Sequence, residues 1–392
     1  MSDRLKTILL TTFLSGALLG AGQAQADIKV GVLYPTSGGG AIYGTPAMQG
    51  HTLALKEINA SGGILGQKVV SFARDSKLNP AAASAAAKEL IAKEGVTVIL
   101  GGVASSVGLA LSEVSKQEKV IYIATIPKSI KITTTKLHPY VFRTASNTDF
   151  EGDAMATIMK QVGGEKICDI QLDYAYGHDL AKGIKKALPQ HAPDAQVILD
   201  LWPKLGATDY NAYITQIMGA GCDTVTSGLW GNHFVNFAKQ AKPFGLFKNV
   251  KFIAGGEVGS HEVASKMGED YPDNVWSNSY ELWYHIKTDA HRKFHEALAK
   301  TAGTEETAMW PVLAYNGLMF YKAAVEKAGS TDPDKVSKAL EGLTIQTPVG
   351  ALTINPADHQ ANTGQFWGKM VKVQGKEYRE MDAHWVPPPP SE

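Results

Sequence analysis

The sequence predicts an α/β protein built from two doubly wound parallel-sheet lobes that are joined by a multi-crossing hinge. Short, continuously apolar strands alternate with helical periods from Ile28 onward, which is typical of parallel sheets covered by helices on both faces. The same rhythm restarts after Arg143, and no linker rich in Pro, Gly or Ser separates the two halves. A single core for 392 residues would be unusually large, so two lobes are expected.

The first half begins with the buried strand 28–34, a Gly-rich turn and a helix. Apolar residues of this helix recur at helical spacing between Met48 and Ile58, and Gly62 then ends it. The later elements expected in this half are the strands 68–73, 96–100 and 120–124 and the helices 80–93 and 107–117.

The second half repeats this pattern. Its expected elements are the strands 166–172, 196–201, 223–227 and 250–254 and the helices 177–188, 209–219 and 231–242. Between about 285 and 345 the periodicity becomes helical, with segments at 308–328 and 334–343, and a short β-rich end follows. These late helices are expected to return to the first lobe.

The chain should therefore cross between its lobes several times. We expect an N-terminal lobe of residues 27–143 and 277–364 and a C-terminal lobe of residues 144–276 and 365–392, which ends in a Pro-rich tail. Multiple crossings of this kind make a hinge with a cleft beside it.

Residues 1–26 have the layout of a secretory signal peptide. Arg4 and Lys6 precede an apolar run at 8–21, and the segment closes on the small-residue site 24–26. The alternative, a buried N-terminal helix, leaves the polar Gln-Ala-Gln-Ala before the first strand unexplained. We expect export to the periplasm.

Charge and cysteine content restrict the function classes. The 38 Lys and Arg residues balance 38 Asp and Glu residues, which gives no electrostatic reason to expect nucleic acid as a partner. The two cysteines, Cys168 and Cys222, each open an apolar strand. In an oxidising compartment they can form a disulfide, and two buried free thiols are the equally weighted alternative.

Ligands of open parallel sheets bind where the strands end, so the residues after each strand are the site candidates. The candidates are Tyr43, Ser105, Ser106, Thr125 and Lys128 in the first lobe and Tyr176, Trp230 and Glu257 in the second, with Tyr174 beside Tyr176. Hydroxyls and a cation thus face aromatic rings and a carboxylate. This combination favours an organic ligand with an anionic group and an apolar body.

Each candidate also has a structural interpretation. Ser105 or Ser106 can be an ordinary helix cap, and Lys128 can be a solvated surface lysine. Tyr43 and Trp230 can be core aromatics, and Glu257 can form an ion pair that stabilises the lobes.

Motifs of catalysis do not match. The Gly-rich segment 38–44 places Tyr43 where a dinucleotide loop needs its last glycine. His291 and His295 share a helix face, but the H-E-x-x-H order of a zinc protease is missing. We expect no enzyme activity, no cofactor and no metal site.

The residues that carry these features also resemble a known family. The matching segments are 31–38, Tyr43-Gly44, 60–66, 101–106, 142–144, Tyr176-Gly177 and 348–350. Over essentially the whole mature chain the sequence is similar to the periplasmic leucine/isoleucine/valine-binding proteins of ABC importers, which have the type I periplasmic binding protein fold. The resemblance implies a monomeric receptor that closes on a hydrophobic amino acid or related solute and docks on an inner-membrane permease and ATPase complex.

Position by position, the resemblance assigns roles to several candidates. It implies that Ser105 holds the ligand's α-carboxylate. Glu257 falls near the position at which the family has the acid that holds the ligand's α-ammonium. The residues implied to contact the ligand are Tyr43, Tyr176 and Trp230.

At the fourth strand the sequence departs from the family, because Ile126-Pro127-Lys128 replaces its Ala-Ala-Thr. With a lysine at this position, together with Trp230, Trp276 and Tyr280, the sequence is similar to family members that bind aromatic carboxylates, such as benzoates or phenylpropenoates. The ligand-binding component of an extracytoplasmic sensor is the alternative function.

Overall fold

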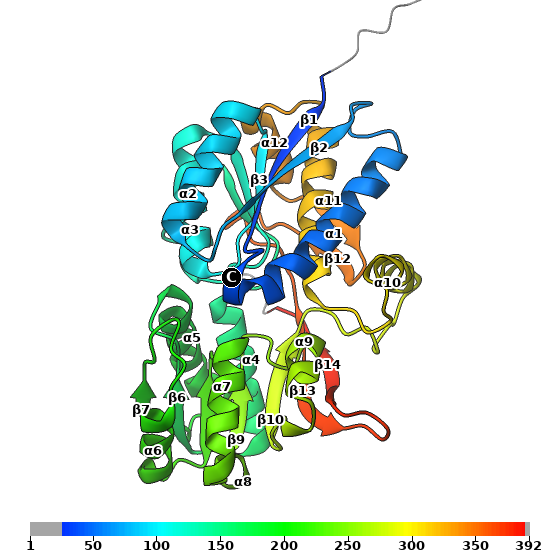
Figure 1. The fold of residues 1–392 in the computed structure, drawn as a ribbon. Coiled ribbons are helices and arrows are strands. Elements are labelled where there is room, and N and C mark those ends of the chain that lie inside the picture. Colours follow the sequence, from blue (N-terminus) through cyan, green and yellow to red (C-terminus); the bar gives the residue numbers. More distant parts are fainter. Residues whose placement is uncertain (1–25, 389–392) are drawn as a thin grey trace, which may run out of the picture.

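The computed structural model describes residues 26–388, so the predicted export signal lies, except for its last residue, outside the described residues. Two α/β lobes are stacked end to end, with the helices of each lobe packed around a central sheet (Figure 1). This arrangement confirms the predicted fold class. Among residues 26–388, no helix is both long and apolar enough to cross a membrane.

The first lobe contains a five-stranded parallel sheet in the order β2-β1-β3-β4-β5. Its strands are β1 (Ile28–Tyr34), β2 (Val69–Asp75), β3 (Val98–Gly101), β4 (Ile121–Ala124) and β5 (Val141–Arg143). Its helices are α1 (Ala41–Ala60), α2 (Pro80–Glu89), α3 (Ser105–Glu118), α11 (Trp310–Ala328) and α12 (Pro333–Leu340). Figure 1 shows α2 and α3 on one face of this sheet and α1 and α11 on the other. The late helices therefore return to the first lobe.

The second lobe contains a seven-stranded sheet in the order β14-β13-β10-β9-β8-β6-β7. Its strands are β6 (Lys166–Ile170), β7 (Gln196–Leu201), β8 (Thr224–Ser227), β9 (Lys251–Ala254), β10 (Val275–Ser279), β13 (Gln365–Lys372) and β14 (Arg379–Val386). Its helices are α4 (Thr148–Val162), α5 (Ala175–His191), α6 (Asn211–Ala220), α7 (Asn232–Ala241), α8 (Leu246–Asn249) and α9 (His261–Met267). β13 and β14 run antiparallel because the chain returns here as a hairpin, so this sheet is not wholly parallel.

The remaining elements connect the lobes or lie at their edges. They are α10 (Asp289–Ala302), the hairpin strands β11 (Thr344–Thr347) and β12 (Gly350–Thr353), and the short turns η1 (Gly38–Gly40), η2 (Leu90–Glu94), η3 (Ile130–Thr133), η4 (Lys242–Phe244) and η5 (Gly268–Asp270). The lobe boundary expected between residues 276 and 277 falls inside β10, which pairs with both β9 and β13 of the second sheet.

Local sequence explains where the elements at the cleft begin. The Asn147 side chain accepts a hydrogen bond from the Phe150 amide and so caps α4. α3 starts at Ser105, two residues earlier than expected, after a turn in which Gly101 and Gly102 have φ angles of 120° and 83°. A Cβ on Gly101 would lie 2.4 Å from the Leu33 carbonyl oxygen, so this turn requires glycine.

Within residues 26–388 the chain crosses between the lobes after β5, after β10 and after β12. Arg143 ties two of these crossings together from the end of β5. Its guanidinium donates hydrogen bonds to the Ser129 carbonyl at 2.5 Å, to the Thr133 hydroxyl at 2.6 Å and to the Gln360 amide oxygen at 2.5 Å. Complete burial lowers the pKa of Arg143 to about 10, which leaves it charged at neutral pH. The hinge is therefore a packed polar junction.

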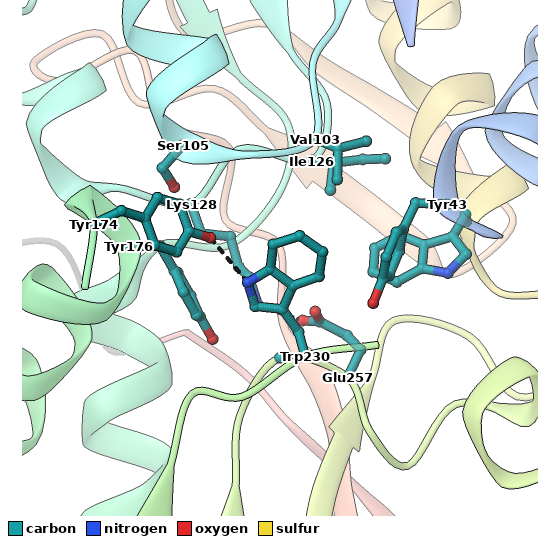
Figure 2. A pocket seen from close by; sticks show the side chains of 11 residues that line it. Tyr43, Val103, Ser105, Ile126, Lys128, Tyr174, Tyr176, Trp230 and Glu257 are labelled. Carbon is teal, nitrogen blue, oxygen red and sulfur yellow. Dashed lines mark hydrogen bonds and ion pairs between the residues drawn. The ribbon is translucent and has the colours of Figure 1, made fainter. Parts of the chain in front are cut away.

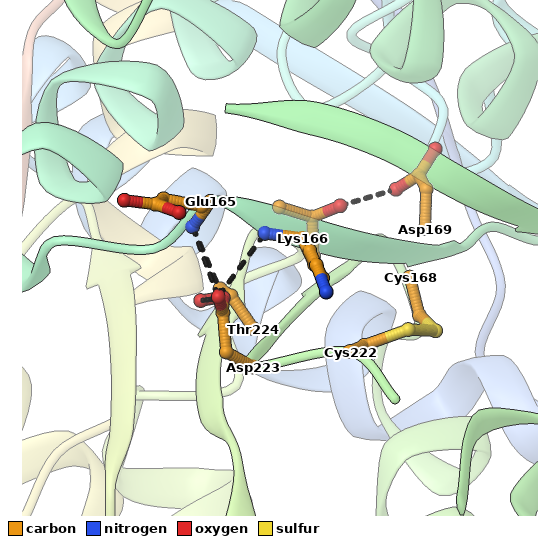
Figure 3. The surroundings of a disulfide bond; sticks show 8 residues. Glu165, Lys166, Cys168, Asp169, Cys222, Asp223 and Thr224 are labelled. Atoms are coloured by element: carbon orange, nitrogen blue, oxygen red, sulfur yellow. Dashed lines mark hydrogen bonds between the residues drawn. A yellow bond between two sulfur atoms is a disulfide. The ribbon is translucent and has the colours of Figure 1, made fainter. Parts of the chain in front are cut away.

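A disulfide between Cys168 and Cys222 resolves the alternative that the sequence left open. Cys168 lies in β6 and Cys222 lies just before β8, with a Cα–Cα distance of 5.8 Å (Figure 3). Beside it, the Asp223 carboxylate accepts hydrogen bonds from the backbone amides of Glu165 and Lys166. The disulfide thus links β6 to the residue pair that precedes β8, its neighbour in the sheet of the second lobe.

We expect the variant in which Cys168 and Cys222 are both replaced by Ala to unfold more easily. The bond closes a loop between residues 54 positions apart, for which chain entropy estimates about 4 kcal/mol of stabilisation. Urea unfolding monitored by circular dichroism measures the difference. Reductant should lower the midpoint of the wild type but not of the variant, and equal midpoints without reductant would show that the disulfide does not stabilise the fold.

Candidate functional site

A narrow cavity lies between the two lobes, at the edges where their parallel strands end (Figure 2). Its lining residues are Tyr43, Val103, Ser105, Ile126, Lys128, Tyr174, Tyr176, Trp230, Gly256, Glu257 and Trp310. Its free volume is about 30 Å³. Because side chains from both lobes meet across so small a space, the structure represents a closed arrangement of the lobes.

The structure brings six of the eight predicted site residues to this cavity: Tyr43, Ser105, Lys128, Tyr176, Trp230 and Glu257. The other two, Ser106 and Thr125, do not line it. The buried Thr125 side chain turns into the first lobe, where its hydroxyl lies 2.6 Å from the Tyr34 hydroxyl. Ser106 follows Ser105 on α3, and consecutive helical residues point in different directions.

Two aromatic residues that the sequence associated with the site lie elsewhere. Trp276 packs beneath the Lys369 ammonium, 5.0 Å from the ring centre. The Tyr280 hydroxyl is 2.7 Å from the Ser146 hydroxyl at the hinge. Neither residue lines the cavity.

Several residues at the cavity were not among the site candidates predicted from the sequence. Val103 and Ile126 follow β3 and β4, so the strand-end rule could have found them. Trp310 starts α11, far along the chain, and no local pattern marks it. Glu151, in the first turn of α4, contacts the cavity residue Lys128. An acidic residue in a first helical turn is ordinarily explained by its favourable interaction with the helix dipole, so the sequence gives no sign of this contact.

Aromatic rings from both lobes form the walls of the cavity. Tyr43 of α1 meets Trp230, which follows β8, edge to face at 5.3 Å, and it meets Trp310 at 4.7 Å. The Trp230 indole nitrogen donates a hydrogen bond to the Tyr174 hydroxyl at 3.0 Å, drawn as the dashed line in Figure 2. A Cβ on Gly231 would lie 2.0 Å from the Tyr43 hydroxyl, so glycine is needed for this approach. These contacts fix the positions of the rings around a small space.

Two hydroxyls in the cavity can bind a ligand. The buried Tyr43 hydroxyl has no hydrogen-bond partner among the described residues. The Ser105 hydroxyl accepts a hydrogen bond from the Ser129 amide at 3.0 Å, which leaves its own proton available to donate. Ser105 is the first residue of α3, and no side chain caps that helix because Ala104 precedes it. The helix end and the Ser105 hydroxyl together suit an anionic group.

Three charged side chains meet at the base of the cavity. Lys128 of the first lobe places its ammonium 2.9 Å from the Glu151 carboxylate and 2.5 Å from the Glu257 carboxylate, both of the second lobe. Each of these side chains is at most 7% exposed. The ion pair that the sequence allowed for Glu257 is therefore present, and its partner is Lys128. We call Lys128, Glu151 and Glu257 the interlobe triad.

Further donors hold the two carboxylates of the interlobe triad in place. Glu151 accepts hydrogen bonds from the Gly256 amide, the Asn278 side chain and the Tyr176 hydroxyl at 2.9, 3.0 and 3.1 Å. Glu257 accepts one from the Gln365 side chain at 3.0 Å. These hydrogen bonds and the Lys128 ammonium offset the cost of burying the two carboxylates.

Glu257 also has an unusual backbone. Its φ angle of 55° lies in the left-handed region, which costs a non-glycine residue about 1 kcal/mol or more. The Glu257 amide donates to the Asn278 side-chain oxygen at 2.9 Å, which helps to hold this conformation. From this backbone position the Glu257 carboxylate reaches the Lys128 ammonium.

The interlobe triad perturbs the pKa values of its members. Burial raises the pKa of Glu257 to about 7; the Lys128 charge opposes this rise and the Glu151 charge adds to it. Burial tends to lower the pKa of Lys128, but the two carboxylates outweigh burial and raise that pKa well above its ordinary value. Lys128 therefore stays charged, and Glu257 holds its proton to a higher pH than an exposed glutamate does.

A second polar contact links the lobes beside the cavity. Asp179 of α5 is buried and accepts a hydrogen bond from the Ser129 hydroxyl at 2.5 Å, and it pairs with the Lys131 ammonium at 2.8 Å. Because Ser129 also donates its amide to Ser105, this contact adjoins a cavity residue directly. Asp179 thus helps to hold the lobes together.

We expect the stability difference between the wild type and Glu257→Gln to depend on pH. The raised pKa of Glu257 means that the folded protein holds this proton more tightly than the unfolded chain does. Ionisation of Glu257 therefore destabilises the fold as pH rises from 4.5 to about 7. Thermal melts should show the wild type losing stability relative to the variant over this range; a constant difference would contradict the raised pKa.

We expect Asp179→Asn to shift the ligand-free protein toward an open form. The change removes the ion pair with Lys131 and weakens the hydrogen bond from Ser129, a loss of about 1–2 kcal/mol. Small-angle scattering should show a larger radius of gyration than for the wild type. Asp200→Asn is the control, because it breaks the Lys185–Asp200 pair within the second lobe. Equal radii for all three proteins would exclude this role for Asp179.

Comparisons with known proteins identify the family. A family model described as periplasmic binding protein matches residues 27–376. A Leu/Ile/Val-binding protein homologue of Brucella melitensis is 28% identical over 351 residues, which cover 88% of this chain and 92% of its own. A leucine-, isoleucine-, valine-, threonine- and alanine-binding protein of Pseudomonas aeruginosa is 26% identical, with coverages of 84% and 86%.

A solved structure agrees. A solute-binding protein of an ABC transporter from Rhodopseudomonas palustris, in complex with p-hydroxybenzoic acid, superposes with a TM-score of 0.85 at 26% identity. The match covers 93% of this chain and 98% of that chain. These findings confirm the two-lobed fold of type I periplasmic binding proteins that the sequence predicts. The chain belongs to the periplasmic binding protein family.

Proposed function

We propose that this protein is the extracytoplasmic solute-binding component of an ABC importer of the branched-chain amino acid type. It captures a small carboxylate ligand between its lobes, as a monomer, and delivers it to an inner-membrane permease that is powered by an ATPase. The family match and the names of the relatives support the importer role. The family's members bind solutes, so the proposed activity is binding and not turnover.

The observation that carries this proposal is the cavity itself. It combines the uncapped start of α3 and the Ser105 hydroxyl with aromatic walls, and both lobes contribute to it. A carboxylate fits the α3 end, where backbone amides and Ser105 donate hydrogen bonds. Val103, Ile126 and Trp230 offer apolar walls to the body of the ligand, and the Tyr43 hydroxyl lies within the same cavity.

The ligand fits the aromatic or hydrophobic acids that the sequence suggested, such as a benzoate, a phenylpropenoate or a hydrophobic amino acid. Lys128 contributes to the site through the interlobe triad, since both nearby carboxylates already bind its ammonium. The carboxylate of the ligand is therefore assigned to Ser105 and α3, and Tyr176 and Glu257 complete the site from the second lobe.

Closure couples binding to transport. A ligand stabilises the closed form only through contacts that it makes with both lobes at once. A micromolar ligand corresponds to about −8 kcal/mol, which a few charge-assisted hydrogen bonds and one buried ring can supply after ordering costs. The closed form then presents both lobes together to the permease.

We also propose that the chain is exported and that its two lobes have the bounds expected from the sequence. Residues 1–26 serve as a signal peptide that directs the chain to the periplasm, where a disulfide such as Cys168–Cys222 persists. The lobes comprise residues 27–143 with 277–364 and residues 144–276 with 365–392, apart from β10, whose strand continues into residue 279.

We expect purified mature protein to be stabilised by small carboxylates in a thermal-shift panel of benzoates, phenylpropenoates and branched-chain amino acids. For the best ligand, calorimetry should show that Ser105→Ala weakens binding by about tenfold or more, because a hydrogen bond to a charged group is lost. Ser106→Ala is the matched control and should bind as the wild type does. Stabilisation by sugars or peptides alone would refute the proposed ligand class.

A further inference from the structure

The interlobe triad contains an ammonium group held between two buried carboxylates. The Lys128 nitrogen lies 2.9 Å from Glu151 and 2.5 Å from Glu257, and Lys128 and Glu257 both line the cavity. A pair of buried carboxylates is the kind of group with which a protein recognises an amine. Here the chain supplies that amine from its own first lobe.

Little acceptor capacity remains for an amine of the ligand. Lys128, Gly256 and Asn278 donate to Oε1 of Glu151, and Tyr176 donates to its Oε2. On Glu257, Oε1 accepts hydrogen bonds from Lys128, Gln365 and, at 3.3 Å, Asn278. Among the described residues, none donates to Oε2 of Glu257. Oε2 of Glu151 accepts only the bond from Tyr176, but Glu151 does not line the cavity. Oε2 of Glu257 is therefore the acceptor of the interlobe triad that a ligand in the cavity can reach.

A ligand ammonium at this oxygen would share one carboxylate with Lys128. Two cations would then be buried close together, and each must lose its hydration to enter the cavity. A neutral hydroxyl can donate to the same oxygen without adding charge. A ligand without any donor leaves the interlobe triad intact as well. The arrangement therefore disfavours ligands that carry an ammonium group.

We infer that Lys128 takes the place of a ligand ammonium and thereby makes the site selective for amine-free organic acids over α-amino acids. This inference rests on the proposed function, because it concerns which carboxylates the cavity accepts. It identifies Lys128 as a specificity-determining residue that acts through Glu151 and Glu257. The substrate class is a small apolar or aromatic acid, with at most a neutral hydrogen-bond donor facing Glu257.

Matched ligand pairs test the inference on the wild type. 3-Phenylpropionate and phenylalanine differ only in the α-ammonium, and so do 4-methylpentanoate and leucine. Calorimetry should show that the amine-free member of at least one pair binds about tenfold more tightly or better. Equal or tighter binding of the amino acid in both pairs would overturn the inference and leave the carboxylate-binding function standing. If no member of either pair and no benzoate binds, the proposed function fails.

Removal of the internal ammonium gives a sharper test. Lys128→Met leaves both carboxylates without their cation, so we expect the affinity ratio of amino acid to amine-free acid to rise by about a hundredfold. Lys136→Met is the control, since Lys136 is an exposed lysine of the same segment outside the cavity, and it should leave the ratio unchanged. An unchanged ratio in folded Lys128→Met would overturn the inference.

A second variant, Lys128→Ala, allows the inference to be tested by chemical rescue. Lys128→Ala leaves a void in place of the lysine side chain, and added ethylammonium should restore binding of the amine-free acid toward the wild-type value. Sodium at the same concentration should not restore it. Rescue supports the inference, whereas a wild-type ratio of amino-acid to amine-free-acid affinity in Lys128→Ala without ethylammonium contradicts it. If both variants fail to fold, the wild-type pairs decide.

Discussion

The pairing of Lys128 with Glu151 and Glu257 is the interaction on which the closed structure depends most directly. It crosses from the loop after β4 to α4 and to the loop after β9, and it lies at the base of the cavity. A buried charge left without its partner is far more costly than a surface one. Opening the lobes must therefore separate or rehydrate these groups, which links the electrostatics of the cavity to the motion of the hinge.

The rest of the site is arranged around this fixed base. Aromatic rings from both lobes narrow the cavity, and Gly231 lets the Tyr43 hydroxyl approach the second lobe closely. Ser129 connects Ser105 with Asp179, so the proposed anion site and an interlobe contact share one residue. Arg143 links the crossing after β5 to the Ser129 carbonyl and to Gln360. Binding and closure thus involve the same set of hydrogen bonds.

The sequence predicts much of this because parallel strands end at one edge of a sheet. Ser105, Lys128 and Glu257 all follow strands, and that position alone indicates a shared site. The direction in which a side chain points is harder to foresee. Thr125 also ends a strand, yet it turns into the core and bonds to Tyr34.

Pairings between distant segments cannot be read from local patterns. Lys128 and Glu257 are 129 positions apart, and their contact depends on how the two lobes close. Glu151 resembles an ordinary acid of a first helical turn, and Gln365 starts β13, more than a hundred positions after Glu257. Lys128 is among the candidates for ligand binding that the sequence predicts, and the structure shows that its ammonium already has two carboxylate partners.

A crystal structure of the protein with a bound carboxylate ligand would test the central claim most directly. We expect the ligand carboxylate to contact Ser105 and the start of α3, while the Lys128 ammonium stays bound to Glu151 and Glu257. A structure in which Lys128 leaves both glutamates and binds the ligand carboxylate instead would contradict it.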